Sequence, residues 1–366
     1  MKARSANAAK SLPGRYYASK DIFAQEAERI FASRWLYAGR SERLPQKGSF
    51  FLQAVEAESI LVLRDQRGAA RAFYNLCRHR GTRLCQQSEG RFSHSIQCPY
   101  HAWTYDLQGS LSGAPNMKGV EGFEAADYPL IPVALQEWEG FLFLNLAAHP
   151  QPLPQSSAAV RSKFKDWELE KLQVARRIEY RVEANWKLIF QNYSECYHCP
   201  TVHPLLNQLT PYRESSNDLQ AGPILGGPMA LRGPGSSLTL DGRACAPPLG
   251  TLSDRDQGLV YYYSIFPNML LSLHPDYVLV HRLQRLAPAA TRVVCEWLFD
   301  SQAMSQPGFD PSPAIEFWDR TNRQDWQVIE LSQLGVQSRA YSPGPYADLE
   351  SILAAFDREY LMAMAD

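Results

Sequence analysis

Two short segments decide how this sequence is interpreted, Cys77-Arg-His-Arg-Gly81 and Cys98-Pro-Tyr-His-Ala-Trp103. Each supplies one thiolate and one imidazole, from Cys77 and His79 in the first and from Cys98 and His101 in the second. Two such loops can bind a two-iron cluster from opposite sides; if both cysteines hold one iron and both histidines the other, each loop contributes to both irons. A structural zinc site is the alternative, although zinc sites more often pair their cysteines directly.

A second group of candidate ligands follows in Glu195-Cys-Tyr-His-Cys199 and His203. We expect a helix over about 185–199, which would place Glu195 and His198 on one face. Pro200 and Pro204 are expected to end that helix and let His203 turn back towards His198. Two imidazoles and a carboxylate would form a facial triad with open positions, which suits Fe(II).

Other interpretations of this segment are weaker. A di-iron carboxylate site needs a second Glu-x-x-His motif, which the sequence lacks. Cys196 and Cys199 form a Cys-x-x-Cys pair, but a redox motif of this kind is expected after a strand rather than inside a helix. Two unrelated buried histidines remain the plainest alternative.

The carboxylate of the triad is expected on a helix over about 312–334, where two aspartates are candidates. Asp325 shares one helical face with several neighbours, namely Trp318, Thr321, Val328 and Ile329. A carboxylate among apolar side chains is costly to bury unless it is paired or bound to metal. Asp319 lies on a different face with Arg323, where an ordinary ion pair explains it. This difference favours Asp325 over Asp319.

Together these motifs resemble the large (alpha) subunit of the Rieske non-haem iron oxygenases, and the resemblance covers nearly the whole chain. It implies an N-terminal all-β Rieske domain and a helix-grip-like catalytic domain with an antiparallel sheet. It also implies that Cys77, His79, Cys98 and His101 bind a [2Fe-2S] cluster. The implied ligands of a mononuclear Fe(II) are His198, His203 and Asp325, which lies five residues before Glu330, as in the family's pattern.

The resemblance implies an activity as well. Electrons would come from NAD(P)H through a separate flavin- and iron–sulfur-containing reductase, and O2 would be used to hydroxylate a small organic substrate. Glu195 would be the catalytic carboxylate that links the mononuclear iron to a Rieske histidine of a neighbouring subunit, so a homotrimer is expected, with a hexamer left open. Hydroxylation of an N-methyl group would release formaldehyde.

The substrate class is the least determined part of this interpretation. Most ring-hydroxylating members have Asp where this chain has Glu195, and Glu195-Cys-Tyr-His-Cys199 resembles members that act on betaine, stachydrine or carnitine. Trp318, Phe266 and Tyr193 could offer aromatic faces to a quaternary ammonium group, although core packing explains each of them singly. Two alternatives stay open: a ring-hydroxylating alpha subunit in aromatic compound catabolism, and an electron-transfer or metal-binding protein without oxygenase activity.

Composition sets the remaining limits. The 366 residues carry 37 basic and 38 acidic side chains, so nucleic acid and anionic membranes are not expected partners. Seven cysteines are too few for a disulfide scaffold, and the N-terminus has no apolar run typical of a signal peptide. We therefore expect a cytoplasmic protein with reduced thiols. The uncharged stretch 257–275 contains Pro267 and Asn268, which favour two strands and a turn over a membrane span.

The pattern of apolar runs and turn residues predicts an α+β fold in three parts. Residues 1–36 would form an arm and a helix, capped at Ser19, that packs on the catalytic domain; 37–149 would form the β domain; and 150–366 the catalytic domain. The Pro/Ser-rich stretch 149–157 marks the main boundary. Strands are expected near 259–266, 269–274, 277–286 and 291–299, and helices near 312–334 and 346–364.

Overall fold

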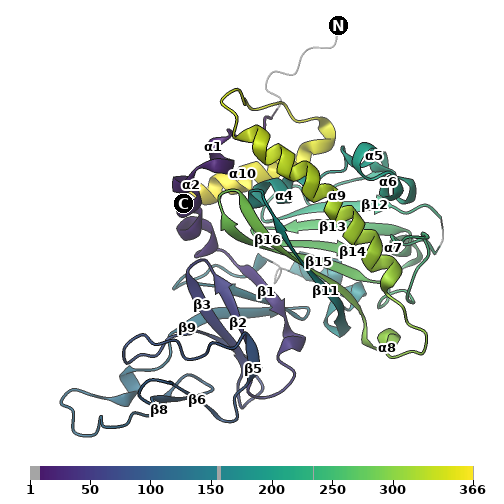
Figure 1. The fold of residues 1–366 in the computed structure, drawn as a ribbon. Coiled ribbons are helices and arrows are strands. Elements are labelled where there is room, and N and C mark those ends of the chain that lie inside the picture. The colour runs from purple at the N-terminus through teal and green to yellow at the C-terminus, as the bar shows by residue number, and fades with distance from the viewer. Residues whose placement is uncertain (1–8, 155–157, 234, 366) are drawn as a thin grey trace. The chain divides into compact units, whose positions relative to one another are not determined.

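The computed structural model describes residues 9–154, 158–233 and 235–365, which divide into two compact units. One, here called the β unit, is Phe31–Leu153. The other, here called the mixed unit, comprises the described residues of Met1–Ile30 and Pro154–Asp366. The β unit is built from strands and short helical turns, and the mixed unit combines an antiparallel sheet with helices (Figure 1). The predicted α+β fold class is therefore confirmed.

Two antiparallel sheets form the β unit, in the strand orders β1-β10-β9-β4-β3-β2-β5 and β6-β7-β8. The strands are β1 (Leu36–Arg40), β2 (Ser49–Val55), β3 (Glu58–Arg64), β4 (Ala70–Tyr74), β5 (Glu89–Arg91), β6 (Ser95–Gln97), β7 (Thr104–Asp106), β8 (Leu111–Gly113), β9 (Pro132–Trp138) and β10 (Phe141–Asn145). The segment with Cys77 follows β4, and the segment with Cys98 joins β6 to β7. Both cysteines lie in the same buried cluster as Leu61, Phe73 and Trp103.

The mixed unit is organised around one antiparallel sheet in the order β11-β16-β15-β14-β13-β12. Its strands are β11 (Leu172–Val182), β12 (Ile224–Ala230), β13 (Leu259–Ile265), β14 (Met269–Leu273), β15 (Val278–Ala287) and β16 (Ala290–Asp300). The four strands predicted between 259 and 299 are confirmed, and the turn between β13 and β14 contains Pro267 and Asn268. Within the described residues, no helix has the length and apolar character needed to cross a bilayer.

Helices cover this sheet, and the longest of them, α9, lies across one of its faces (Figure 1). The helices are α1 (Arg15–Ala18), α2 (Lys20–Glu26), α3 (Ala158–Phe164), α4 (Trp186–Tyr193), α5 (Cys199–Val202), α6 (Pro204–Leu209), α7 (Asp254–Gln257), α8 (Ser301–Met304), α9 (Ser312–Val336) and α10 (Ser351–Ala365). The buried positions of α9 include Trp318, Thr321, Asn322 and Ile329, so they recur every three or four residues as an amphipathic helix requires. Asp325 falls within this buried stripe.

The helix predicted over 185–199 is wrong in its second half, because α4 ends at Tyr193. The Ser194 hydroxyl donates to the carbonyl of Phe190, and the Glu195 carboxylate accepts from the backbone N–H groups of Tyr197 and His198. Side chains that bond the local backbone in this way compete with helical hydrogen bonding. The chain therefore leaves the helix before Glu195, and a shared helical face is not what brings Glu195 to His198.

The two prolines of this segment also act differently from the prediction. Pro200 lies in the first turn of α5, and Pro204 is the first residue of α6. A proline in the first turn lacks an N–H that would have no helical partner there in any case. Both prolines therefore begin short helices instead of ending a long one, and His203 lies at the junction between them.

The N-terminal helix α2 is held to the mixed unit by a buried carboxylate. Ser19 caps α2 as predicted, because its side chain accepts from the backbone N–H of Ile22 at 3.3 Å. Glu26, at the end of α2, pairs with Lys187 and with Arg285 inside the core. Residues 1–8 of the predicted arm lie outside the described residues.

A buried aspartate on α10 leads to a prediction about pH. Asp357 accepts hydrogen bonds of 2.7 Å from Gln191 and from Tyr346, and burial raises its pKa from 3.8 to about 6. A carboxyl with a raised pKa stabilises the fold at pH values below its ordinary pKa, and this contribution is lost as the pH rises towards 6. Asp357→Asn should therefore stabilise the protein at pH 7, and by about 1 kcal/mol more than it does at pH 5.

This prediction is tested by urea unfolding of both proteins at the two pH values. Asparagine keeps the shape of the side chain, so any change in packing contributes equally at both values. An increase in the free energy of unfolding of Asp357→Asn that does not depend on pH, or that is larger at pH 5 than at pH 7, would contradict the prediction.

Candidate metal and substrate site

Three predicted ligands of the mononuclear iron meet on one side of the mixed unit. His198 follows α4, His203 lies between α5 and α6, and Asp325 comes from α9. Asp325 Oδ1 lies 2.8 Å from His203 Nε2 and 3.3 Å from His198 Nε2. Among the described residues, these three form the only group of three or more His, Cys, Asp or Glu side chains whose ligand atoms all lie within 4.8 Å of one another.

Two further side chains orient the imidazoles of this group. His198 Nδ1 lies 2.5 Å from Glu195 Oε1, and His203 Nδ1 lies 2.8 Å from Gln324 Oε1. When each Nδ1 carries the proton and donates it to these oxygens, each Nε2 presents a lone pair towards Asp325. Such partners fix the tautomer and ring orientation of a metal-binding histidine. The donor set of two imidazole nitrogens and one carboxylate therefore fits a divalent iron with open positions.

The charges of this group are strongly coupled. Burial alone would lower the pKa of His198, but its hydrogen bonds with Asp325 and Glu195 outweigh burial and raise the pKa to about 10. Burial would raise the pKa of Asp325, but the hydrogen bonds from His198 and His203 hold it below its ordinary value. Without metal, a protonated and positively charged His198 therefore partly neutralises the carboxylates of Asp325 and Glu195. A bound metal cation would supply this positive charge instead.

The competing aspartate has a different environment. Asp319 accepts hydrogen bonds from Tyr180 at 2.7 Å and from Arg323 at 2.9 Å. The side chain of Arg323 is 61% exposed, so Arg323 and Asp319 form an ordinary ion pair at the surface. The structure thus brings Asp325 to the two imidazoles and leaves Asp319 outside the group.

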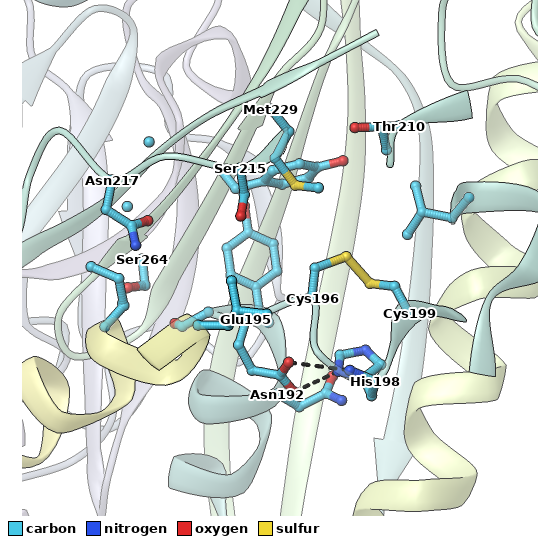
Figure 2. A pocket seen from close by; sticks show the side chains of 18 of the residues that line it. Asn192, Glu195, Cys196, His198, Cys199, Thr210, Ser215, Asn217, Met229 and Ser264 are labelled. Carbon is cyan, nitrogen blue, oxygen red and sulfur yellow. Dashed lines mark hydrogen bonds and ion pairs between the residues drawn. A yellow bond between two sulfur atoms is a disulfide. The ribbon is translucent and has the colours of Figure 1, made fainter. Parts of the chain in front are cut away.

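The expectation that all thiols are reduced is wrong in this structure, because a disulfide joins Cys196 to Cys199 (Figure 2). The expected continuous helix through both residues argued against a Cys-x-x-Cys redox motif here, but that helix is absent, since α4 ends at Tyr193. With α4 ended at Tyr193, the chain turns at Glu195, and the Cα atoms of the two cysteines lie 5.0 Å apart, within the range of disulfides. The disulfide encloses His198. The other five cysteines are free.

A pocket lies beside the three predicted ligands, and its empty space, including the solvent at its mouth, is about 820 Å³. Its wall includes His198, His203 and Asp325, the carboxylate of Glu195 and three aromatic side chains, Tyr193, Tyr262 and Trp318. The rest of the wall is contributed mainly by small polar residues and apolar residues of α6, β12 and α10. Of the three aromatic residues that the sequence singled out, Trp318 and Tyr193 line the cavity. Phe266 instead packs near Trp186 and Phe356.

The segments 77–81 and 98–103, which contain the four predicted cluster ligands, form a second site in the β unit. Each loop is closed by a hydrogen bond from the N–H four residues after its cysteine, from Gly81 to Cys77 at 2.9 Å and from Ala102 to Cys98 at 3.1 Å. Gly81 and Ala102 both have a positive φ, of 73° and 56°, so the two loops turn in the same way. The rings of His79 and His101 lie 4.8 Å apart, between centroids.

The two kinds of ligand in these loops differ in exposure. Cys77 is 1% and Cys98 3% exposed, whereas both histidines are partly exposed. Tyr105 lies 3.3 Å from Cys77 Sγ, a contact of the kind that tunes the potential of an iron–sulfur centre. These four side chains are not among the groups of three or more ligand side chains that the described residues bring close enough to hold one metal ion, as a single tetrahedral zinc would require. They fit an extended cluster, with thiolates inside and imidazoles towards the surface.

Both parts of the chain resemble known protein families. Residues 34–124 match the Rieske [2Fe-2S] domain, and residues 169–366 match the catalytic domain of the ring hydroxylating alpha subunit. Over 92% of its length the chain is 34% identical to the glycine betaine monooxygenase oxygenase subunit of Chromohalobacter salexigens, and it covers 82% of that protein. This chain belongs to the Rieske non-haem iron oxygenases.

Other relatives cover different shares of this oxygenase. The carnitine monooxygenase oxygenase subunit of Escherichia coli K12 is 36% identical over 53% of the chain and 52% of its own length. A crystal structure of the quaternary ammonium Rieske monooxygenase CntA has the same fold, with a TM-score of 0.82 at 23% identity over 98% of this chain and 96% of its own. Naphthalene 1,2-dioxygenase from Rhodococcus sp. has the fold as well, with a TM-score of 0.76 at 20% identity over 96% and 94% of the two chains.

Membership confirms several expectations. The oxygenase is an oxidoreductase that incorporates molecular oxygen, and its cofactors are a Rieske [2Fe-2S] cluster and a mononuclear non-haem iron. The relatives at least 30% identical that are named above are oxygenase subunits of monooxygenases. The reading as a pure electron carrier is therefore wrong. The alternative of a role in aromatic compound catabolism has no support in the relatives above that are at least 30% identical, which are named for betaine and carnitine.

Sequence reasoning missed several residues of the site. Gln324 directly precedes Asp325 in the sequence, so it could have been predicted to lie near the metal site. An amide side chain, however, is not a typical metal ligand and belongs to no metal-binding motif. Thr210 and Tyr262 line the cavity from a helix end and from β13 and carry no motif at all. These residues reach the site through the fold, and spacing in the sequence does not identify them.

Gln324 gives a prediction about iron affinity. Gln324→Ala removes the acceptor that orients His203, and the loss of such a partner typically weakens metal binding about 10- to 100-fold. We expect the variant to bind Fe(II) at His198, His203 and Asp325 more weakly by that amount, measured by competition with a chelator. Gln327→Ala, on the same helix, is the matched control and should bind iron as the wild type does. Equal affinity in the two variants would contradict the role of Gln324.

Proposed function

We propose that this oxygenase removes a methyl group, by hydroxylation and release of formaldehyde, from a small N-methylated ammonium compound. The observation that supports this proposal is the set of aromatic side chains in the cavity wall, namely Tyr193, Tyr262 and Trp318. Tyr262 lies with its ring centroid 6.0 Å from that of Tyr193 and 6.3 Å from that of Trp318, at interplanar angles of 80° and 67°. Rings set at steep angles around one space can present faces to a cation, which cation–π attraction stabilises.

The acidic side chains of the cavity wall also favour a cationic substrate. Glu195 and Asp325 contribute carboxylates to the wall, and both lie near the two imidazoles. A quaternary ammonium group has no proton to donate, so aromatic faces and diffuse negative charge are the interactions open to it. The relatives named for glycine betaine, carnitine and choline act on compounds with such a group, which supports the proposal.

In this proposal Cys77, His79, Cys98 and His101 hold the Rieske cluster, and His198, His203 and Asp325 hold the mononuclear iron. When bound, the cluster supplies single electrons, and the iron provides the open positions at which O2 is activated. Glu195 and Gln324 hold the proton on Nδ1 of the two iron-binding histidines. The aromatic wall orients the ammonium group so that one N-methyl faces the three ligands, and it excludes water from that space.

The test is the release of formaldehyde from N-methylated ammonium compounds by the iron-loaded enzyme with a surrogate reductase. We expect formaldehyde and substrate-dependent O2 consumption in equal amounts, and none in the absence of the ammonium compound. Arenes such as naphthalene serve as the comparison. Turnover of arenes without any turnover of ammonium compounds would reject the substrate class and favour a ring-hydroxylating enzyme.

A finer proposal concerns Glu195 and the assembly. Glu195 Oε1 bonds the iron-binding His198, and the neighbouring Tyr197 is 57% exposed in the single chain. In the β unit, Tyr100 beside His101 is 56% exposed. An aromatic residue at the surface beside each metal site suits an interface between copies of the chain. We infer a homotrimer in which Glu195 passes electrons from the partner's cluster, with NAD(P)H in the cytoplasm as their source.

Glu195→Ala tests this finer proposal. The variant should keep its Rieske absorption, and it is assayed with Fe(II) in excess, because loss of the partner of His198 should weaken iron binding as it does for Gln324→Ala. With both metals bound, reduction of the cluster should no longer lead to product, so coupled turnover should fall by at least about a hundredfold. Glu214→Ala, an exposed glutamate farther along the chain, is the control. Full coupled turnover of Glu195→Ala with both metals bound would overturn the electron-transfer role, and a monomer in light scattering would overturn the trimer.

A further inference from the structure

Two hydroxyl groups in the cavity wall have no hydrogen-bond partner among the residues that the structure describes. Other hydroxyls of the wall are hydrogen-bonded already, Tyr193 to Ser272 at 2.8 Å and Thr321 to the carbonyl of Phe317 at 2.9 Å. Thr210 Oγ1 and the Tyr262 hydroxyl are buried and have no hydrogen-bond partner. A buried hydroxyl without a partner is destabilising, so such groups in native proteins usually meet a ligand or an ordered water.

The two hydroxyls come from separate parts of the mixed unit. Thr210 follows the last residue of α6 and is 0% exposed, and Tyr262 lies on β13. Both line the same cavity as His198. In Figure 2, Thr210 and Met229 lie at one end of the labelled residues, and His198 and Asn192 lie at the other. A substrate with an N-methyl group at the metal ligands would therefore extend its opposite end towards Thr210.

The charges of the wall restrict what that opposite end can be. Among the described residues that line the cavity there is no lysine or arginine, and the two acidic residues are Glu195 and Asp325. A substrate carboxylate would lose its water here without meeting a cationic side chain, which is costly. A neutral hydroxyl can donate one hydrogen bond and accept others. Burial raises the pKa of Tyr262 well above its ordinary value, so the phenol stays protonated and able to donate.

We propose that Thr210 and Tyr262 bind the hydroxyl group of the substrate, and that the preferred substrate is an N-methylated ammonium alcohol rather than the corresponding carboxylate or alkyl compound. This inference rests on the proposed function and makes its substrate class more specific. The two residues determine specificity, because they touch the part of the substrate that distinguishes these compounds. They take no part in the oxidation itself.

The test compares three probes that share a trimethylammonium group, with a 2-hydroxyethyl, an n-propyl or a carboxymethyl substituent. Dissociation constants are measured by calorimetry on the iron-loaded enzyme without O2, and formaldehyde release is measured in parallel. We expect the hydroxyethyl compound to bind tightest, by roughly tenfold over the propyl compound, as two hydrogen bonds to a buried site would produce.

Two isosteric variants assign this preference to the residues. Thr210→Val and Tyr262→Phe should each weaken binding of the hydroxyethyl compound by roughly five- to tenfold and leave binding of the propyl compound nearly unchanged. Thr321→Val is the matched control, because its hydroxyl is already bonded to the backbone. In this control variant, the ratio of the dissociation constants of the hydroxyethyl and propyl compounds should equal that of the wild type.

The outcomes separate this inference from the proposed function. If the propyl compound binds and releases formaldehyde as well as the hydroxyethyl compound, or if the carboxymethyl compound binds tightest, the inference is overturned and demethylation stands. If Thr210→Val and Tyr262→Phe weaken all three probes equally, or neither variant changes binding, the hydroxyls are occupied by water and the inference falls. If none of the probes binds or releases formaldehyde, the proposed function fails and this inference fails with it.

Discussion

Asp325→Ala is expected to abolish iron binding at the mononuclear site and to lower turnover by well over a hundredfold. The Oδ1 atom of Asp325 is the point towards which His198 Nε2 and His203 Nε2 converge, at 3.3 and 2.8 Å. Without this carboxylate, two imidazoles remain, and an Fe(II) ion loses its only negatively charged protein ligand. Loss of an outer partner of a ligand already weakens metal binding about 10- to 100-fold, so loss of a ligand should exceed that.

Iron content by elemental analysis and formaldehyde release measure the effect. Asp319→Ala is the matched control on α9, because it removes a carboxylate that bonds Tyr180 and Arg323 and lies outside the group of ligands. The control should keep both its iron and most of its activity, and both variants should keep the visible absorption of the Rieske cluster. Iron loss in the Asp319 variant, with iron retained in the Asp325 variant, would assign the ligand to Asp319.

Glu26→Ala is expected to destabilise the mixed unit by about 3–5 kcal/mol, as the removal of one partner from a buried ion pair typically does. Glu26 pairs with Lys187, accepts from Arg285 at 3.0 Å and accepts from Trp186 and Tyr360 at 3.1 and 2.8 Å. Lys187 is 0% exposed, and burial lowers its pKa to about 8 even though Glu26 opposes this shift. Without the carboxylate, the Lys187 ammonium group would be buried beside another cation.

Urea unfolding followed by tryptophan fluorescence measures this loss. Glu28→Ala, an exposed glutamate just beyond α2, is the control and should change stability by no more than about 0.5 kcal/mol. Glu26→Gln keeps one of the two acceptor oxygens but loses the charge and the other acceptor, so its stability should fall between those of the two alanine variants. Equal stability of the Glu26 and Glu28 alanine variants would show that the buried charges relax into solvent.

Much of the site was predictable because it depends on residue type and local spacing. A thiolate and an imidazole in each of two loops, or two histidines after a glutamate, form a chemical signature that few other folds share. The strands from β13 to β16 were predictable for a similar reason, since apolar runs and turn residues such as Pro267 and Asn268 act over a few positions. The place of Asp325 beside His198 and His203 was predictable as well, because the period of α9 is a local property.

The errors arose where side chains interact with the backbone or with distant residues. Glu195 accepts from the N–H groups of Tyr197 and His198, and this local competition ended α4 early, which a helical pattern does not reveal. The disulfide between Cys196 and Cys199 joins residues three positions apart, which lie within disulfide range in a helix as well as in this turn, so a helical pattern does not exclude it.

The sequence by itself determined which side chains can bind the two iron centres and the class of fold that carries them, because ligand chemistry and short-range periodicity are written along the chain. Only the tertiary structure decided which neutral groups complete the site. Gln324 behind His203, and the unpartnered hydroxyls of Thr210 and Tyr262, come together from a long helix, a helix end and a strand. Their roles depend on burial and on the absence of other partners, which are properties of packing in three dimensions.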